Sequence, residues 1–358
     1  MTALAAILAR RIAADGPMRL SDYMAECLLN PVHGYYATRD PFGAAGDFTT
    51  APEISQMFGE LLGLCLAQCW LDQGSPAPFA LAEIGPGRGT LMADMLRAIR
   101  AVPGMAEAAR VHLVEASPAL RARQAETLDG HAPEWHGRVE DLPDLLLFLI
   151  ANEFFDALPV RQFERRGPGW AERMVGLRDD RLAPGLGPVT PYPALAGRLA
   201  DTADGDVVET CPPAAPIAQE IASRITRHGG AALVIDYGGW HSLGDTFQAV
   251  KDHAPADPFA EPGKADLTAH VDFEPIARAF GAAGAAVTAL TPQGVFLERL
   301  WIAARAEVLA RGLAGPALRA HLAAHRRLTH PDEMGQLFKV LAAYPKGKAP
   351  PPGLDPAG

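Results

Sequence analysis

The spacing of apolar residues predicts helices in the first part of the chain. Residues 1–14 alternate apolar and basic side chains at helical spacing, and the turn-forming pair Gly16–Pro17 ends that helix. Ser21 is placed to cap a second helix. Residues 33–50 are rich in glycine, aromatic residues and threonine, so they predict an ordered loop. A long apolar helix is then expected over residues 52–70, because Pro and Glu stand at its start.

From residue 79 the pattern changes to strands that alternate with helices. Apolar runs at 79–84, 110–115 and 145–152 predict strands, while the stretches 91–100 and 118–128 predict helices. This alternation is typical of βαβ units with right-handed crossovers. The sequence therefore predicts an α/β fold built on a parallel sheet.

The alternation of strands and helices stops between residues 160 and 216, where Gly/Pro-rich turns separate short strand-like pieces. We interpret this stretch as a β-containing insertion on the parallel core. The predicted organisation is an N-terminal helical region at 1–75 that packs on the core, and a main domain at 76–345 that carries the insertion at about 160–216. A Pro/Gly-rich tail at 346–358 is expected to be disordered.

Composition and charge narrow the class of protein. The 358 residues are 49% hydrophobic and 21% charged, with a mean hydropathy of +0.03, which is typical of a globular chain with a full core. The formal net charge of −10 argues against nucleic acid as a partner, because phosphate binding needs clustered Lys and Arg. An acidic surface suits a basic protein or peptide substrate.

The cysteines and the longest apolar runs argue against disulfides, a metal site and a membrane-spanning segment. The four cysteines form no C-x-x-C pair and have no zinc-like spacing, so we predict no disulfide framework and no metal site. The longest apolar stretches, such as 145–151, are too short to span a bilayer, so no membrane insertion is expected. The apolar and basic N-terminal stretch is interpreted as a surface helix rather than a signal peptide.

The central motif is the glycine-rich turn at residues 83–91, EIGPGRGTL, directly after a predicted strand and before a predicted helix. Glycines at such a turn let the backbone approach a ligand closely, and the ligand meets the amide end of the helix. Gly85, Gly87 and Gly89 have the spacing G-x-G-x-G, which differs from the dinucleotide fingerprint G-x-G-x-x-G. Glu83 and Thr90 flank these glycines, and the acidic Glu83 suits a cationic ligand better than a pyrophosphate. A tight turn without a ligand is the alternative.

Glu115 ends the second predicted strand and is a candidate for the ribose hydroxyls of a cofactor. A carboxylate at the tip of the strand next to a glycine loop can accept hydrogen bonds from both hydroxyls. Nicotinamide enzymes bind the ribose of their cofactor in the same way, so Glu115 alone does not identify the cofactor. A solvated strand end is the other interpretation.

The candidate catalytic residues Asn152, Glu153 and Asp156 close the apolar strand at 145–152. They are expected at the carboxyl edge of the sheet, where ligands bind in open α/β folds. Two carboxylates there can clamp a planar guanidinium and make one of its nitrogens more nucleophilic. Helix capping by Asn152 or Asp156 is the structural alternative.

Two further groups of polar residues leave alternatives open. Asp47, Thr49 and Thr50 lie in a polar loop that could fold over the cofactor or contact the substrate, and the same loop could form a turn with an N-cap for the helix that follows. His270 and Asp272 suggest a metal or an acid/base pair. With no third ligand at suitable spacing, we interpret them as part of a hydrogen-bonding loop.

Seven segments of the chain resemble one known family. They are residues 46–60, 83–91, 152–159, 236–238, 265–273, 293–297 and 334–339. The family includes the mitochondrial complex I assembly arginine methyltransferase and bacterial relatives of the MidA type. The likeness covers nearly the whole chain, and the first and fifth segments are its most specific parts.

The resemblance implies a Rossmann-like class I methyltransferase fold with an added N-terminal helical part and S-adenosyl-L-methionine as cofactor. Gly85, Gly87 and Gly89 would form the cofactor loop, Glu115 would bind the ribose and Glu153 would lie beside the substrate. The mitochondrial member symmetrically dimethylates an arginine of a complex I subunit, so the expected partner is a protein, with a homodimer left open. Because no mitochondrial-type leader is visible, we expect a bacterial cytoplasmic location.

Three other functions remain as alternatives. A methyltransferase for a small molecule or a different side chain would use the same cofactor site. A non-enzymatic assembly factor would use the fold to hold a partner protein. A nicotinamide enzyme fits least well because of the glycine spacing.

Overall fold

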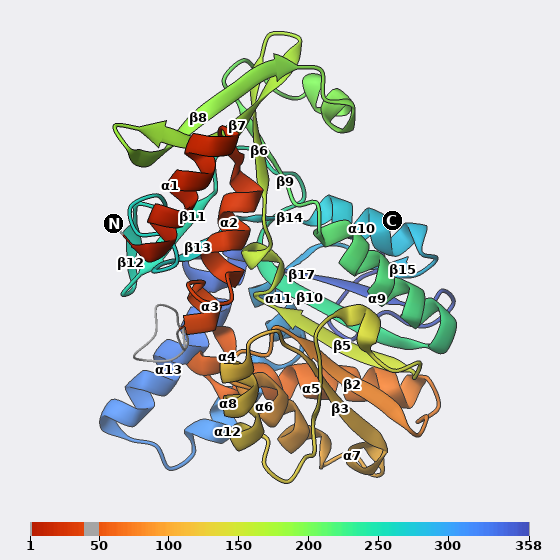
Figure 1. The fold of residues 1–358 in the computed structure, drawn as a ribbon. Coiled ribbons are helices and arrows are strands. Elements are labelled where there is room, and N and C mark those ends of the chain that lie inside the picture. Colours follow the sequence, from red (N-terminus) through yellow and green to blue (C-terminus); the bar gives the residue numbers. More distant parts are fainter. Residues whose placement is uncertain (1, 39–49, 358) are drawn as a thin grey trace. The chain divides into compact units, whose positions relative to one another are not determined.

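The computed structural model describes residues 2–38 and 50–357, which fold into two compact units made of interleaved segments (Figure 1). The first, which we call the N-terminal unit, combines Met1–Phe48, Asp156–Ala214 and Gly239–Asp272. The second, which we call the sheet unit, combines Thr49–Phe155, Ala215–Gly238 and Phe273–Gly358.

A mixed sheet with the strand order β15-β17-β10-β5-β2-β3-β4 forms the centre of the sheet unit. The neighbours among β2, β3, β4, β5 and β10 pair in parallel, whereas β17 runs antiparallel to β10, β15 and β16. The strands are β2 (Phe79–Ile84), β3 (Ala109–Val114), β4 (Glu134–His136), β5 (Leu147–Asn152), β10 (Gly230–Gly239), β15 (Ala286–Val287), β16 (Thr291–Pro292) and β17 (Phe338–Tyr344).

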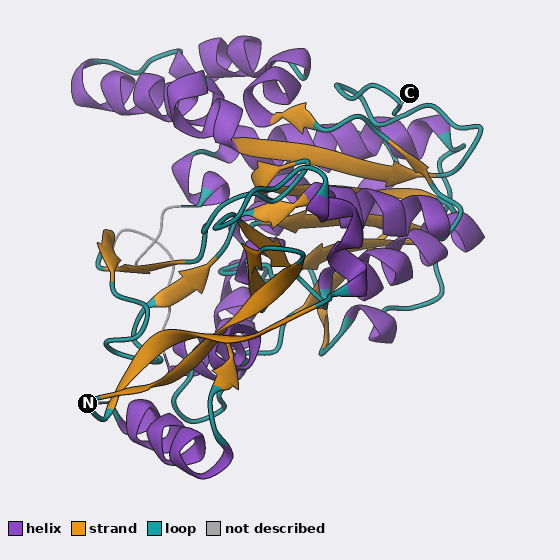
Figure 2. Ribbon diagram, turned by 90° about the horizontal axis from the view of Figure 1, so that it is seen from above, coloured by secondary structure: helices purple, strands orange, loops and turns teal. Residues whose placement is uncertain are grey.

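Helices lie along both faces of this sheet (Figure 2). Every position of β2 and β5 is buried, as expected for apolar strands that are covered on both sides. The helices are α4 (Ala51–Ile54), α5 (Gln56–Asp72), α6 (Thr90–Ile99), α7 (Met105–Ala108), α8 (Pro118–Thr127), η1 (Val139–Asp141), α9 (Ala214–His228), α10 (Phe273–Ala282), α11 (Gln293–Arg299), α12 (Ile302–Ala310), α13 (Gly315–Thr329) and η4 (Pro331–Gly335). Among the described residues, no helix combines the length and apolar character needed to cross a bilayer.

The N-terminal unit contains a sheet of order β1-β7-β6-β9, to which β8 adds by pairing with β7, and a small sheet of order β12-β11-β13. The apolar faces of α1 and α2 supply much of its core, including Leu8 and Tyr23. Its elements are α1 (Ala3–Asp15), β1 (Met18–Arg19), α2 (Leu20–Leu29), α3 (Tyr35–Thr38), β6 (Arg161–Arg166), β7 (Gly169–Arg178), β8 (Arg181–Thr190), η3 (Pro193–Leu199), β9 (Val207–Thr210), β11 (Gln248–Lys251), β12 (Ala254–Ala256), β13 (Asp266–Thr268) and β14 (Val271–Asp272).

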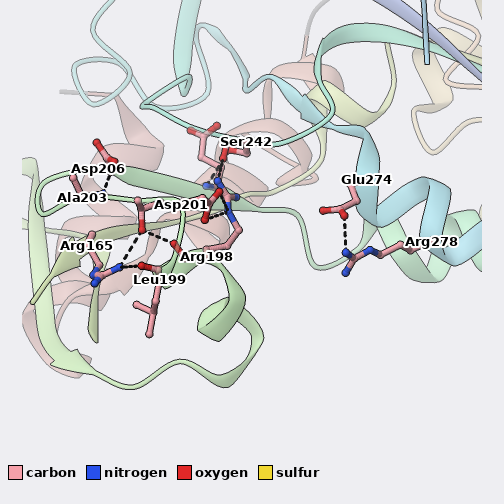
Figure 3. Close-up of polar contacts among 11 residues, drawn as sticks. Arg165, Arg198, Leu199, Asp201, Ala203, Asp206, Ser242, Glu274 and Arg278 are labelled. Atoms are coloured by element: carbon pink, nitrogen blue, oxygen red, sulfur yellow. Dashed lines mark hydrogen bonds and ion pairs between the residues drawn. The ribbon is translucent and has the colours of Figure 1, made fainter. Parts of the chain in front are cut away.

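Two arginines hold the short helix η3 in place within the N-terminal unit (Figure 3). Arg165, on β6, donates to the carbonyl oxygen of Leu199 at 2.9 Å. Arg198 donates to the carboxylate of Asp201 and to the carbonyl oxygen of Ser242 at 2.9 Å. The guanidinium of Arg165 thus satisfies a carbonyl that the short helix leaves open at its end, and Arg198 ties the helix to the segment around Ser242.

The structure confirms the predicted α/β class and the parallel core of the sheet. The expected strands at 79–84, 110–115 and 145–152 are β2, β3 and β5, within two residues at each end. The β-rich insertion also forms strands, β6 to β9. Strand β17 was not predicted from the sequence, although most of its residues are apolar and buried.

The division of the chain differs from the expected one. Helix α5 was assigned to an N-terminal region ending at residue 75, but it belongs to the sheet unit. Its apolar side chains, among them Phe58 and Leu62, lie in the same core cluster as the strand residues Phe79 and Phe148. The inserted strands instead join the first helices to form a separate core.

The tail at 346–358 also differs from its expected disorder. Leu354 is buried in the core of the sheet unit. The amide of Ala289 donates to the carbonyl oxygen of Asp355 at 2.8 Å, and the amide of Ala357 donates to that of Val287 at 2.9 Å. The buried side chain of Leu354 and these two backbone hydrogen bonds therefore anchor a segment whose composition alone suggests disorder.

Candidate cofactor and substrate site

The glycine loop joins β2 to α6 in a conformation that requires glycine. Gly85, Gly87 and Gly89 all have positive φ, at 66°, 52° and 83°. A Cβ atom on Gly85 would lie 3.1 Å from the ring of Phe154, so the loop is closed on that side. Gly89 is the N-cap residue of α6 and has no side chain that could cap the first amides of that helix. The loop therefore has the backbone geometry that a close-fitting ligand needs.

Glu83 lies at the end of β2, just before the loop, and is 3% exposed. Burial raises its pKa to about 8, although a hydrogen bond from the backbone of Met92 opposes the shift. Its Oε2 atom has no hydrogen-bond partner among the described residues. A buried carboxyl with an unmatched oxygen fits a site for a cationic group, since a positive ligand would stabilise the ionised form.

Glu115 follows β3 and its carboxylate is already held in place. Its Oε1 accepts the amide of Ser117 at 2.7 Å, and its Oε2 accepts the side-chain amide of Gln124 at 3.2 Å. Because each carboxylate oxygen has more than one acceptor direction, both can still receive a ribose hydroxyl. Burial raises the pKa of Glu115, and the hydrogen bonds from Ser117 and Gln124 oppose that shift.

Gln124 is a residue that sequence reasoning missed. Its side chain is fully buried on α8, and its Nε2 donates both to Glu115 and to the carbonyl oxygen of Gly87 at 2.8 Å. The indole of Trp135 donates to its Oε1 at 2.8 Å. Gln124 therefore ties the glycine loop to the predicted ribose-binding residue. No local pattern marks it, because its partners lie far away along the chain.

Asn152 is the last residue of β5, and Glu153 begins the turn that follows. Glu153 has a φ of 51°, which is unusual for a residue with a side chain and marks a constrained turn. Its Oε1 accepts the amide of Ala51 at 3.0 Å and the side-chain amide of Asn152 at 3.2 Å. The Oδ1 of Asn152 is buried without a partner among the described residues. These contacts fix the carboxylate that is predicted to lie beside the substrate.

Asp236 supports the same turn from the end of β10. Its Oδ2 accepts the amides of Phe154 at 3.1 Å and Phe155 at 3.0 Å, and its Oδ1 accepts the amide of Tyr237 at 3.0 Å. Asp236 is completely buried. The sequence offered only a weak signal for it, its place in the DYG segment at 236–238.

The short helix α4 links the glycine loop to Glu153. The hydroxyl of Thr90, at the start of α6, donates to Oε1 of Glu53 at 2.6 Å. Two residues earlier, Ala51 supplies the amide that binds Glu153. Neither Glu53 nor Ala51 was predicted as a site residue, and Thr90 has a protein partner in addition to its predicted cofactor role.

The structure brings most of the predicted residues to one edge of the sheet. Because β2, β3 and β5 are parallel neighbours, the residues that follow their carboxyl ends share that edge. The residues of the sequence prediction that are placed there are Glu83, Gly85, Gly87, Gly89, Thr90, Glu115, Asn152 and Glu153. Their roles toward a cofactor or a substrate stay predictions.

Three predicted site residues are not among those placed at this edge. Asp47 and Thr49 lie outside the described residues. Asp156 belongs to the N-terminal unit, where burial, Asp266 and then Asp156 itself raise the pKa of Tyr36. The predicted clamp that combines Glu153 with Asp156 therefore stays a prediction.

The fold and this edge define a class of protein before any comparison is made. A parallel sheet with a glycine loop after one strand and a glutamate just after its neighbour is the arrangement of α/β proteins that bind nucleotide-type cofactors. The unmatched carboxyl of Glu83 favours a cationic cofactor within that class. S-adenosylmethionine is such a cofactor, since it carries a ribose and a sulfonium.

Comparison with known proteins identifies the family. Residues 61–291 match the family model of S-adenosyl-L-methionine-dependent methyltransferases. The chain is 37% identical to the mitochondrial protein arginine methyltransferase NDUFAF7 of Xenopus tropicalis, over 94% of this chain and 85% of that protein. The human protein of the same name is 38% identical over 94% of this chain and 82% of its own length. The chain belongs to this family of S-adenosylmethionine-dependent methyltransferases.

Solved structures agree with this assignment. A COG1565 superfamily member from Burkholderia thailandensis bound to S-adenosyl-homocysteine superimposes with a TM-score of 0.84 at 32% identity, covering 98% of this chain and 94% of that one. A protein of the same superfamily and organism gives a TM-score of 0.83 at 31% identity, covering 98% and 93%. The predicted family, the Rossmann-like methyltransferase fold and the cofactor S-adenosylmethionine are confirmed.

One prediction from the sequence is wrong. A bacterial cytoplasmic location was expected, but the curated relatives that match over nearly the whole chain are named as mitochondrial proteins.

Proposed function

We propose that this methyltransferase transfers the methyl group of S-adenosylmethionine to an arginine side chain of a protein. The observation that carries the proposal is the half-buried, hydrogen-bonded carboxylate of Glu153 at the carboxyl edge of the sheet. A fixed carboxylate at this place can accept hydrogen bonds from a guanidinium. The name of the relatives, protein arginine methyltransferase, supports the same acceptor.

Each residue of the site has one task in this proposal. The backbone at Gly85 and Gly89 approaches the cofactor, Glu83 faces its positive charge and Glu115 accepts its ribose hydroxyls. Bound S-adenosylmethionine supplies a methyl group that is already activated by the sulfonium. The protein mainly has to align that methyl with the acceptor nitrogen and exclude water. Glu153 holds the guanidinium, and Asn152 keeps the Glu153 carboxylate in its orientation.

The finer part of the proposal concerns the product and the partner. We infer symmetric dimethylation of an arginine in a subunit of respiratory complex I, or in another protein. This inference rests on the family resemblance. The negative charge of −10 supports a basic region around the target arginine, because opposite charges favour encounter. We also propose that the protein can act as a homodimer.

The test is methyl transfer from labelled S-adenosylmethionine to the proteins of a cell extract. After hydrolysis of the labelled protein, monomethylarginine and symmetric dimethylarginine are expected to carry the label. Glu153→Gln should lower the rate strongly while binding of S-adenosylhomocysteine is kept. Glu126→Gln, an exposed carboxylate on α8, is the matched control.

Each competing function predicts a different result. Label in a small molecule, or on a side chain other than arginine, would overturn the proposed acceptor. An unchanged rate in Glu153→Gln would remove Glu153 from the mechanism. A partner protein that binds equally well to a Gly87→Val variant, with no transfer by either form, would favour a non-enzymatic assembly factor.

A further inference from the structure

A group of two histidines and one glutamate lies on the edge of the sheet, apart from the residues of the proposed methyl-transfer site. His112 lies in β3, and Glu134 and His136 are the first and last residues of β4. In the parallel register His112 pairs with Glu134, and Val114 pairs with His136. Because alternate residues of a strand face the same side, Glu134 and His136 share one face of β4.

The ligand atoms of the three side chains already converge. Nδ1 of His112 is 3.0 Å from Nε2 of His136 and 3.9 Å from Oε2 of Glu134. All three ligand atoms lie within 4.8 Å of one another. In a tetrahedral zinc site with bonds of about 2.0–2.1 Å, ligand atoms are roughly 3.3 Å apart. Small side-chain rotations therefore suffice to place the three atoms around one ion.

The exposure of the group fits a site that an ion can reach. His112 is 3% exposed, whereas the side chain of Glu134 is 69% exposed. Burial lowers the pKa of His112, which favours the neutral imidazole that binds metal ions. An ion would enter from the Glu134 side, where water can supply a fourth ligand.

We propose that His112 Nδ1, His136 Nε2 and Glu134 Oε2 bind a divalent transition-metal ion of the zinc type. Two imidazoles and one carboxylate form a ligand set that suits Zn²⁺ better than Mg²⁺ or Ca²⁺, which prefer oxygen ligands. No metal site was predicted from the sequence, because these ligands do not stand close together along the chain. These ligands are contributed by two strands, and His112 and His136 are 24 residues apart.

The ion would connect the edge strand β4 to its neighbour β3 through their side chains. Strand β4 has only three residues and lies at the end of the strand order. The backbone carbonyl of His136 accepts the amide of Glu115 at 3.1 Å. A backbone hydrogen bond therefore joins the proposed metal site to the predicted ribose-binding residue. Metal binding would hold β4 against β3 and thereby steady the segment that carries Glu115.

The test is titration of the metal-free full-length protein with zinc chloride, followed by calorimetry. The wild type is expected to bind one equivalent that is lost in Glu134→Gln and in His136→Gln. Removal of an outer-shell partner alone weakens metal sites by roughly 10–100-fold, so loss of a direct ligand should weaken binding at least about tenfold. His131→Gln and Glu126→Gln are matched controls on the same part of the chain, outside the cluster.

Two further readouts locate the site. Cobalt(II) added to the wild type should give visible absorption bands of a tetrahedral ion, and both ligand variants should lack them. Anomalous diffraction at the zinc edge should place the ion between β3 and β4. Because Glu134 is exposed, its replacement by glutamine leaves the core intact. Unchanged zinc affinity in both ligand variants, or no saturable binding by the wild type, would overturn the proposal.

Discussion

At the scale of single residues, the site depends on a few side chains whose burial changes their chemistry. Glu83 is the clearest case, since desolvation raises its pKa from 4.5 to about 8. The protonated form is therefore favoured in the folded protein without a ligand. In the unfolded chain the same group ionises near pH 4.5, so folding binds a proton across this interval.

This shift predicts how stability depends on pH. Because the folded-state pKa lies above the unfolded value, the contribution of Glu83 is fully present below pH 4.5 and is lost as the pH rises towards about 8. Glu83→Gln is expected to flatten that decline. Urea unfolding of both proteins at several pH values across the interval measures the effect. An equal slope in wild type and variant would contradict the assigned pKa, and Glu126→Gln serves as the exposed control.

The same group should couple cofactor binding to proton release. A cationic ligand next to Glu83 stabilises the carboxylate, so binding at neutral pH is expected to release a proton. Calorimetry of S-adenosylmethionine binding in buffers of different ionisation enthalpy detects that proton. The Glu83→Gln variant should release fewer protons. If the two proteins release the same number, Glu83 does not face the positive charge of the cofactor.

Gly85 gives a second prediction at this scale. A Gly85→Ala side chain would have to adopt a φ of 66° and would meet the ring of Phe154 at 3.1 Å. We expect a loss of about 1–2 kcal/mol in stability from the left-handed backbone alone. Cofactor affinity should fall at least about tenfold, because the loop must shift.

A matched control separates the two effects. Gly130 also has a positive φ, at 82°, but a Cβ there would meet nothing within 4 Å. Gly130→Ala should therefore cost stability without weakening the cofactor complex. Chemical unfolding and calorimetry of both variants measure the comparison. Equal cofactor affinity in the two variants would argue against close contact between the cofactor and the loop.

At the scale of secondary-structure elements, the short helix α4 joins two parts of the site. Its residue Glu53 accepts the hydroxyl of Thr90, and its residue Ala51 donates to Glu153. The helix therefore connects the predicted cofactor loop with the predicted substrate residue. No part of the local pattern around 50–54 indicates these partners.

The link through α4 can be tested with a double-mutant cycle. Glu53→Gln and Thr90→Val should each lower stability by about 1 kcal/mol, the usual net value of a hydrogen bond. If the two groups interact, their effects should not add, with a coupling of roughly 0.5–3 kcal/mol. Urea unfolding of the two single variants and the double variant gives the coupling. Additive losses would mean that the hydroxyl and the carboxylate act independently.

The elements also show which features the sequence could predict. Strands β2 and β5 were found because their residues are apolar throughout and glycine or polar residues end them. Strand β17 was missed because it follows helices and pairs antiparallel with β10, whose residues lie about a hundred positions earlier. In the same way Gln124 and Asp236 acquire their roles only from tertiary contacts. The turn built by the glycine motif was predictable from the sequence, whereas the residues that support this turn through tertiary contacts were not.

At the scale of the whole molecule, the chain crosses between its two units several times. Each unit is made of three segments, so no single boundary at residue 75 describes the division. A strongly apolar helix such as α5 was expected to join its sequence neighbours. Its side chains instead complete the core around β2 and α6, because that is where apolar surface is available.

The C-terminal segment provides a test at this scale, because composition and structure lead to opposite expectations. A disordered tail could be removed without cost. In the structure, Leu354 is buried and the amides of Ala289 and Ala357 are hydrogen-bonded across the segment. Deletion of 346–358 should therefore lower the free energy of unfolding by at least about 1.5–3 kcal/mol, the value of one buried leucine side chain.

Single substitutions decide whether Leu354 is the anchor. Leu354→Ala is expected to cost about 2–5 kcal/mol, as for other buried leucines, whereas Lys348→Ala should be neutral because that side chain is exposed. Guanidinium unfolding of the deletion and of both variants measures these differences. If deletion and Leu354→Ala were both neutral, the segment would add nothing to the fold. A loss in both, with none in Lys348→Ala, would show that one apolar side chain fixes a Pro/Gly-rich segment to the sheet unit.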